Sequence, residues 1–199
     1  MTLANKITLG RLWASIILFI LLGMTDEHAP SLGILAAGFF LFILVVATDA
    51  LDGYFARKYG EVSDFGRIAD PAVDKITVVG TLVFLCAMPW ARPVLSAWMV
   101  VLVVGREIIV TGLRGYVESK GIDFSSDAAG KLKMIVQCCA VPGVFFFKMI
   151  ELLFPDVGWA VTGSLYLVIG LMWLMLVLTV WSGFDYGVKA ARLLRGRSA

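Results

Sequence analysis

Long apolar segments constrain this chain more than any other feature of its sequence. A bilayer span needs about 20 mostly apolar residues, and the clearest candidate contains the uninterrupted apolar run 32–47. Six segments qualify as spans: 8–24, 31–48 (continuing as helix towards Tyr59), 71–90, one from about Val94 that becomes charged at Arg106 and Glu107, 133–150 and 159–186.

The composition supports the same class of protein. Hydrophobic residues make up 60% of the 199 residues, charged residues 16%, and the mean hydropathy is +0.90. Soluble domains are about 45–50% apolar and about 25% charged. The apolar segments lack the short alternating pattern of a transmembrane barrel. We therefore predict an all-α integral membrane protein, with six transmembrane helices in one bundle and a single domain over residues 1–199.

The first apolar segment resembles a signal peptide in its flanks, because Lys6 and Arg11 precede it. No small-residue cleavage pattern comes before the acidic turn at Asp26 and Glu27, however. We expect a retained helix.

The distribution of basic residues predicts the orientation. With six spans, fifteen of the seventeen Lys and Arg residues fall at the membrane face that holds both termini, and only Arg92 and Lys148 fall at the opposite face. Positive residues concentrate on the cytoplasmic side of membrane proteins. We therefore expect both termini in the cytoplasm of a multi-pass protein of the bacterial inner membrane.

Charge and cysteine counts exclude two other classes. The net charge of +2 gives no basic footprint for nucleic acid. Cys86, Cys138 and Cys139 are odd in number and lie within apolar runs, which argues against a disulfide framework or a zinc site.

The acidic residues gather in one stretch, 49–74, which holds six of the chain's fifteen. Asp49 and Asp52 are three residues apart, and Asp70 and Asp74 are four apart, so each pair shares one helix face. A single carboxylate at a helix end is explained equally well by contact with water at the interface. Four converging carboxylates beside apolar spans instead indicate a functional site.

Four carboxylates suit a hard divalent cation such as Mg²⁺ or Mn²⁺, and two such ions could clamp a diphosphate. Gly53 and Ala56 lie on the same side as the first acidic pair and would allow a ligand close to the backbone. Gly66 and Ala69 would similarly allow close helix packing. The planar guanidinium of Arg57 suits phosphate oxygens.

The stretch resembles the signature of the class I CDP-alcohol phosphatidyltransferase family, D-x2-D-G-x2-A-R-x8-G-x3-D-x3-D. Every fixed position matches, at Asp49, Asp52, Gly53, Ala56, Arg57, Gly66, Asp70 and Asp74. The resemblance implies transfer of a substituted phosphate from a CDP-linked donor to an alcohol, with release of CMP. It further implies two metal ions held by the four Asp, with Asp74 also the general base, and a homodimer.

The N-terminal Asn5, Thr8 and Arg11 match the NxxTxxR pattern that borders the nucleotide pocket in this family. The CDP-binding residues implied by the resemblance are Asn5, Thr8, Asp52, Gly53, Ala56, Arg57 and Gly66. A helix cap followed by an Arg that reaches the interface is the alternative explanation.

A second stretch, 105–137, bears on the acceptor. Its REIIV and GKLK segments, with a weaker match at 178–186, resemble the bacterial phosphatidylglycerophosphate synthases of this family. An acceptor that carries a phosphate, such as glycerol 3-phosphate, would need the cations that this stretch supplies: Arg106, Arg114, Lys131 and Lys133. The same residues could instead fix topology or bind anionic headgroups. Glu107, beside Arg106, could pair with a cation from another helix, and we assign it no role in the chemistry.

Other functions remain open from the sequence. Inositol phosphate, serine and phosphatidylglycerol are rival acceptors within the family. An intramembrane prenyltransferase would place its acidic motifs far apart, whereas here both pairs lie in one hairpin. A transporter would carry ionisable groups near the middle of several spans, but 159–181 has no charge. We expect CDP-diacylglycerol and glycerol 3-phosphate as the substrates.

Overall fold

The described residues form six long α-helices, which confirms the predicted all-α class and fits a bundle. The structure, a computed structural model, describes residues 3–59, 64–121 and 128–195, with side chains over 7–49, 69–121 and 129–194. Every regular element in these ranges is helical: α1 (Leu3–Gly23), α2 (Leu32–Tyr59), α3 (Asp64–Ala87), the short 3-10 helix η1 (Pro89–Ala91), α4 (Ala97–Ser119), α5 (Ala128–Leu153) and α6 (Gly158–Arg195).

Four helices, α1, α3, α5 and α6, extend further than the apolar segments that predicted them, and the difference is largest in α3 and α6. Helix α3 begins at Asp64 rather than near residue 71, where the predicted span starts, so Pro71 lies inside the helix. Helix α6 continues nine residues beyond Tyr186, to Arg195. Its 38 residues span about 57 Å at 1.5 Å per residue, more than the ~30 Å hydrocarbon core of a bilayer.

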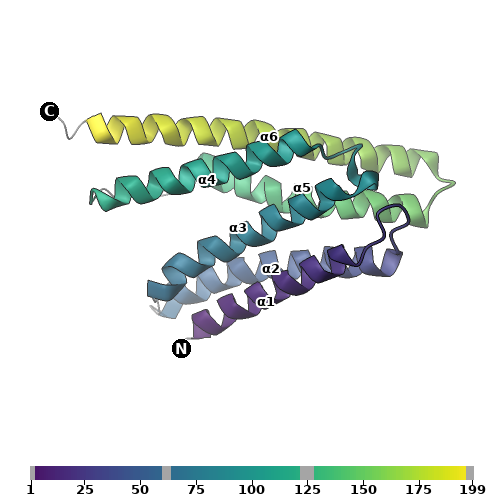
Figure 1. Ribbon diagram of the computed structural model, residues 1–199, viewed down its shortest axis with the longest axis horizontal. Helices are drawn as coiled ribbons and strands as arrows, with labels where there is room; N and C mark the ends of the chain where they lie inside the picture. Colours follow the sequence, from purple (N-terminus) through teal and green to yellow (C-terminus); the bar gives the residue numbers. More distant parts are fainter. Residues whose placement is uncertain (1–2, 60–63, 122–127, 196–199) are drawn as a thin grey trace.

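The helices are packed as a closed ring in the order α1, α2, α5, α6, α4 and α3, and α3 also contacts α5 across the middle. Both termini lie at the same end of the bundle, and at that end α1, α2 and α3 diverge from α4 and α6 (Figure 1). The turn between α5 and α6 lies at the opposite end (Figure 1). The chain therefore has a termini end and a far end.

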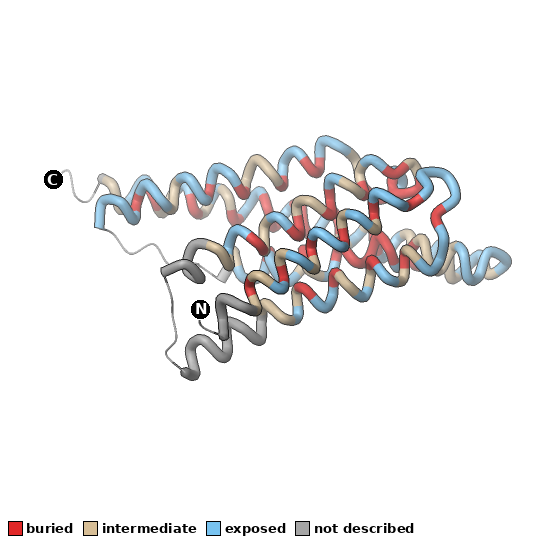
Figure 2. Tube along the Cα trace, turned by 60° about the horizontal axis from the view of Figure 1, so that its bottom comes forward, coloured by how far each residue is buried: buried red, intermediate tan, exposed pale blue. Residues whose placement is uncertain are grey.

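Apolar side chains occupy the inside of the bundle and much of its outside. Every helix contributes to the core, with fully buried residues such as Leu18, Phe42, Leu82 and Phe145, and buried positions alternate with exposed ones along each helix (Figure 2). Exposed large apolar residues such as Phe40 cover the outer faces. In the described part of the chain, three helices are long and apolar enough to cross a membrane: the spans cover Leu32–Asp49, Ala129–Leu153 and Gly158–Leu194.

A second, smaller cluster lies between α4 and α6 towards the termini end. Val110, Val117, Tyr186 and Ala190 form it, each at most 8% exposed. The two helices therefore remain packed together beyond the main core.

Helices α1 and α3 approach each other closely at Gly80. A β-carbon at this position would lie 2.3 Å from the Phe19 ring of α1, and that ring stacks on Phe84 with centroids 5.6 Å apart. Nearby, the buried hydroxyls of Ser15 and Thr77 are hydrogen-bonded at 2.6 Å. This contact fixes α1 against α3, the helix that carries Asp70 and Asp74.

We predict that Gly80→Ala lowers the free energy of unfolding by about 1–3 kcal/mol, because the added methyl displaces the Phe19 ring from its stack. Gly163→Ala in α6 is the matched control: a β-carbon there meets nothing within 4 Å, so the better helix propensity of Ala should leave stability equal or higher. Thermal unfolding of the detergent-solubilised proteins measures both. Equal melting temperatures for the two variants would contradict this packing.

Candidate active site

Three of the four predicted carboxylates lie among the described side chains, at the termini end of the bundle. Asp49 is on α2, and Asp70 and Asp74 are on α3. Asp49 and Asp74 are close enough to repel each other electrostatically. Carboxylates from α2 and α3 therefore lie within electrostatic range of each other at this end. The side chains of Asn5, Asp52, Gly53, Ala56, Arg57 and Gly66 lie outside the described residues.

Helix α1 supplies a partner to two of these carboxylates. Thr8 donates a hydrogen bond from Oγ1 to Asp70 Oδ1 at 2.5 Å, and Arg11 Nη1 lies 2.5 Å from Asp49 Oδ1. The Arg11 guanidinium is buried, and none of its three nitrogens has a well-aligned hydrogen-bond acceptor among the described residues. The positive charge of Arg11 therefore lies close enough to Asp49 to compensate its negative charge. The N–H groups of Arg11 remain available to an anion, because they have no aligned acceptor among the described residues.

The donor set is chemically suitable for a divalent cation. Carboxylate oxygens are the ligands that Mg²⁺ and Mn²⁺ prefer, and Asp49, Asp70 and Asp74 come from adjacent helices. The described residues alone do not form a group of three or more His, Cys, Asp or Glu side chains arranged to hold a metal. Asp52 would have to complete the set, and Arg11 would have to release Asp49.

A cavity of about 690 Å³ connects the carboxylate end with the cations of α4 and α5. Asp74 and Lys75 of α3 line one side, and residues of α4, α5 and α6 line the rest. Its charged lining residues are Asp74, Lys75, Arg106, Glu107, Arg114, Glu118, Lys131 and Lys133, five cations against three acids. The cavity therefore carries an excess of two positive charges.

Arg106 is the most firmly held of the predicted acceptor-site cations. Its Nη1 lies 3.1 Å from Glu107 Oε1, its Nη2 donates to Ser182 Oγ at 3.1 Å, and its guanidinium stands 5.5 Å from the centre of the Tyr186 ring. The side chain crosses α6 where Gly183 leaves room, because a β-carbon there would lie 3.1 Å from Arg106 Cγ.

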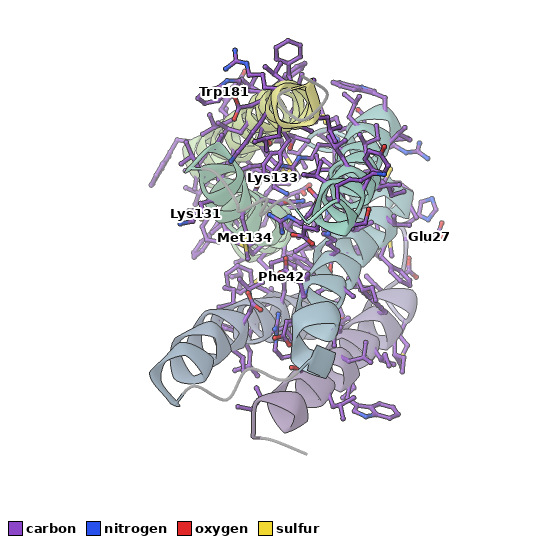
Figure 3. The ribbon with its side chains drawn as sticks, turned by 90° about the vertical axis from the view of Figure 1, so that its left-hand side faces the viewer. Glu27, Phe42, Lys131, Lys133, Met134 and Trp181 are labelled. Atoms are coloured by element: carbon purple, nitrogen blue, oxygen red, sulfur yellow. The ribbon has the colours of Figure 1, made fainter. Side chains whose placement is uncertain are left out.

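The structure places the other three predicted cations differently. Lys133 is buried, and its Nζ reaches Glu107 Oε1 at 2.5 Å, with the side chain directed between the helices (Figure 3). Arg114 lines the cavity with a buried Nε that has no hydrogen-bond partner among the described residues, and the same is true of Arg106 Nε. Lys131 is exposed at the outer edge of α5 (Figure 3), at the rim of the cavity.

Sequence reasoning missed several residues of this cavity. Lys75 Nζ donates to Thr111 Oγ1 at 2.5 Å, and Gln137 and Tyr186 also line the space. Glu107 lines it too, paired with Lys133 of another helix as the sequence suggested. Two features of the sequence point to these residues. One is the carboxylate of Glu107 within the apolar fourth span, and the other is the four-residue spacing of Ser182 and Tyr186, which places both on one face of α6. Neither signal reveals which cation is the partner.

Comparison with known proteins identifies the relatives of this chain. The model of one sequence family, described as CDP-alcohol phosphatidyltransferase, matches residues 1–181. A CDP-diacylglycerol–glycerol-3-phosphate 3-phosphatidyltransferase of Bacillus subtilis (strain 168) is 32% identical, over 94% of this chain and 94% of the relative. A probable phosphatidylglycerophosphate synthase of Mycobacterium tuberculosis is 31% identical over 98% of this chain and 84% of the relative.

We predict that inorganic phosphate raises the melting temperature of the detergent-solubilised protein, because an anion that binds the folded state stabilises it by mass action. In Arg106→Gln, the phosphate concentration that gives the same rise in melting temperature should be at least about tenfold higher, since charge-assisted contacts to phosphate are strong. Arg92→Gln, an exposed arginine at the far end, is the control and should respond like the unaltered protein. An unchanged phosphate response in Arg106→Gln would contradict an anion site in this cavity.

Proposed function

Because the chain belongs to the CDP-alcohol phosphatidyltransferase family, we propose that it transfers the phosphatidyl group of CDP-diacylglycerol to glycerol 3-phosphate. The products are phosphatidylglycerophosphate and CMP. The observation that carries the proposal is the single cavity in which Asp74 and five cations meet. The names of full-length relatives support the same substrates.

The donor occupies the α1–α2–α3 side of the site in this proposal. The buried Arg11 guanidinium, whose N–H groups lack aligned acceptors among the described residues, lies beside Asp49 and suits the diphosphate. Asn5, Thr8, Asp52, Gly53, Ala56, Arg57 and Gly66 border the cytidine nucleotide by resemblance. The apolar outer faces of the bundle keep the acyl chains in lipid.

The phosphate of the acceptor occupies the α4–α5–α6 side. Arg106 and Arg114 each direct a guanidinium with an unpartnered, buried Nε within the described lining, and Lys133 adds a buried ammonium. An excess of two positive charges matches a phosphate monoester, which carries about −1.5 to −2 at pH 7. Lys131, at the rim, attracts the anion before it enters.

Asp74 connects the two halves because it lines the cavity on the carboxylate side. In the proposed reaction it accepts the proton of the acceptor hydroxyl. The hydroxyl oxygen then forms a bond to the lipid-linked phosphorus of the donor, and the bond from that phosphorus to the CMP oxygen breaks. The cations hold the acceptor phosphate away from this centre, so that the hydroxyl rather than the phosphate points at Asp74.

Two divalent cations, Mg²⁺ or Mn²⁺, complete the proposal, with Asp49, Asp52, Asp70 and Asp74 as ligands. When bound they would neutralise charge on the diphosphate and polarise the reacting phosphorus. Arg11 would then turn from Asp49 towards the donor phosphates.

The experiment that tests this function is an acceptor panel with defined CDP-diacylglycerol and Mg²⁺. Glycerol 3-phosphate should release CMP and give phosphatidylglycerophosphate, and removal of divalent cations with EDTA should stop the reaction until Mg²⁺ or Mn²⁺ is restored. Preference for inositol phosphate, serine or phosphatidylglycerol would overturn the choice of acceptor and leave the family chemistry intact.

We predict that Asp74→Asn lowers kcat by about 10²–10⁴-fold, the usual contribution of a positioned general base. Asp156→Asn is the matched control, because Asp156 is exposed in the turn between α5 and α6 at the far end. It should keep the original rate. Near-original turnover in Asp74→Asn would remove Asp74 from the chemistry.

We further propose that all six helices cross the bacterial inner membrane, with both termini and the cavity facing the cytoplasm, and that the protein is a homodimer. The positive residues at the termini end support the orientation. Cross-linking in native membranes tests the homodimer.

A cysteine-labelling experiment tests the orientation. In a variant without its three native cysteines, Asp156→Cys should react with a membrane-impermeant maleimide added outside intact spheroplasts. Ser119→Cys, exposed at the other end, should react only after permeabilisation. The reverse pattern would invert the proposed orientation.

A further inference from the structure

Glu107 is a buried carboxylate placed among the cations of the cavity. It is 8% exposed, lies in the middle of α4 directly after Arg106, and lines the cavity. A negative charge next to a phosphate site repels the phosphate, unless neighbouring cations compensate it. The contacts of Glu107 show which cations these are.

One oxygen of Glu107 joins two of the proposed phosphate ligands. Oε1 lies 2.5 Å from Lys133 Nζ on α5 and 3.1 Å from Arg106 Nη1 on α4. Lys133 is 6% exposed, so its ammonium has little water to replace this partner. Without the carboxylate, two positive charges near one point would repel each other and move apart.

The same helical turn also reaches a third cation. The Glu107 backbone carbonyl accepts a hydrogen bond from Thr111 Oγ1 at 2.6 Å, and Thr111 Oγ1 accepts one from Lys75 Nζ at 2.5 Å. Arg106 is fixed from its other side by Ser182 and Tyr186 of α6. The Glu107 carboxylate therefore joins cations from α4 and α5, and its backbone carbonyl connects through Thr111 to Lys75 of α3.

We propose that Glu107 is a positioning residue of the acceptor site, which holds Arg106 and Lys133 in the arrangement that receives the acceptor's phosphate. It thereby sets the preference for a phosphorylated acceptor over a free alcohol. The inference rests on the proposed function, since it assigns the phosphate at this end of the cavity to the acceptor. A carboxylate with a purely structural role would join α4 to α5 and leave acceptor affinity unaffected.

The test compares Glu107→Gln, which keeps the shape and removes the charge, with the unaltered protein. The KM for glycerol 3-phosphate should rise at least about tenfold, because breaking a buried ion pair leaves the remaining charge unpaired and misplaced. The KM for CDP-diacylglycerol should stay within about twofold, and the preference for glycerol 3-phosphate over glycerol should fall. Glu107→Asp, which keeps the charge, should recover part of the affinity.

Glu151→Gln is the matched control. Glu151 forms a carboxylate–lysine pair with Lys148 at 3.0 Å on α5, away from the cavity, so its loss should leave both KM values unchanged. Should Glu107→Gln fail to fold, Glu107→Asp replaces it, and a raised KM for glycerol 3-phosphate alone supports the proposal.

Three results would overturn the inference. The KM for glycerol 3-phosphate could stay unchanged in a variant of lower melting temperature, which would make Glu107 structural. It could fall, which would make Glu107 a competitor of the phosphate. Finally, both KM values could rise equally, which would show that Glu107 does not act on the acceptor site in particular.

A phosphate titration keeps the inference separate from the proposed function. If the unaltered protein does not use glycerol 3-phosphate, the proposed function is wrong. Stabilisation by inorganic phosphate would still measure how well the cavity cations bind an anion. Glu107→Gln should weaken that stabilisation relative to Glu151→Gln, and an equal response would overturn the positioning role.

Discussion

The pairing of charges inside an apolar bundle is the constraint on which the termini end depends. A charge removed from water is costly unless a partner compensates it, and here Arg11 faces Asp49 while Glu107 faces Lys133 and Arg106. The Arg11–Asp49 pair joins α1 to α2, and the Lys133–Glu107 pair joins α5 to α4. In the proposed function, the Arg11–Asp49 pair would exchange partners when the donor binds, whereas the pairs of Glu107 would keep Arg106 and Lys133 in place.

Helix content could be predicted because it follows a local rule: apolar length predicts helices. The spacing of Asp70 and Asp74 likewise predicts that these two share one helix face, and both lie on α3. The choice between Lys131 and Lys133 could not be predicted, since both carry the same charge two residues apart. Helix rotation turns Lys133 inward to Glu107 and leaves Lys131 at the rim. Partners from another helix, such as Ser182 for Arg106, depend on packing that one sequence does not display.

The division of labour between the helices explains how one family could serve many acceptors. Helices α1, α2 and α3 carry the signature residues and contact one another closely, as at Phe19 and Gly80. Helices α4 and α5 carry four of the five cavity cations, and α6 contributes Ser182 and Tyr186, which orient Arg106. In the proposed function, changes in the second set would alter what enters the cavity without changing Asp74, so the chemistry and the choice of acceptor could vary separately.

The length of α6 has a thermodynamic consequence. Within lipid, helices associate without a hydrophobic driving force, because acyl chains are as apolar as the side chains. The α6 helix is too long for the hydrocarbon core alone, and the cluster of Val110, Val117, Tyr186 and Ala190 extends its contact with α4 towards the termini end. Where that contact meets water, it is driven by solvent entropy and weakens on cooling. The framework around Arg106 would then loosen in the cold as a soluble protein does, while the lipid-embedded contacts would not.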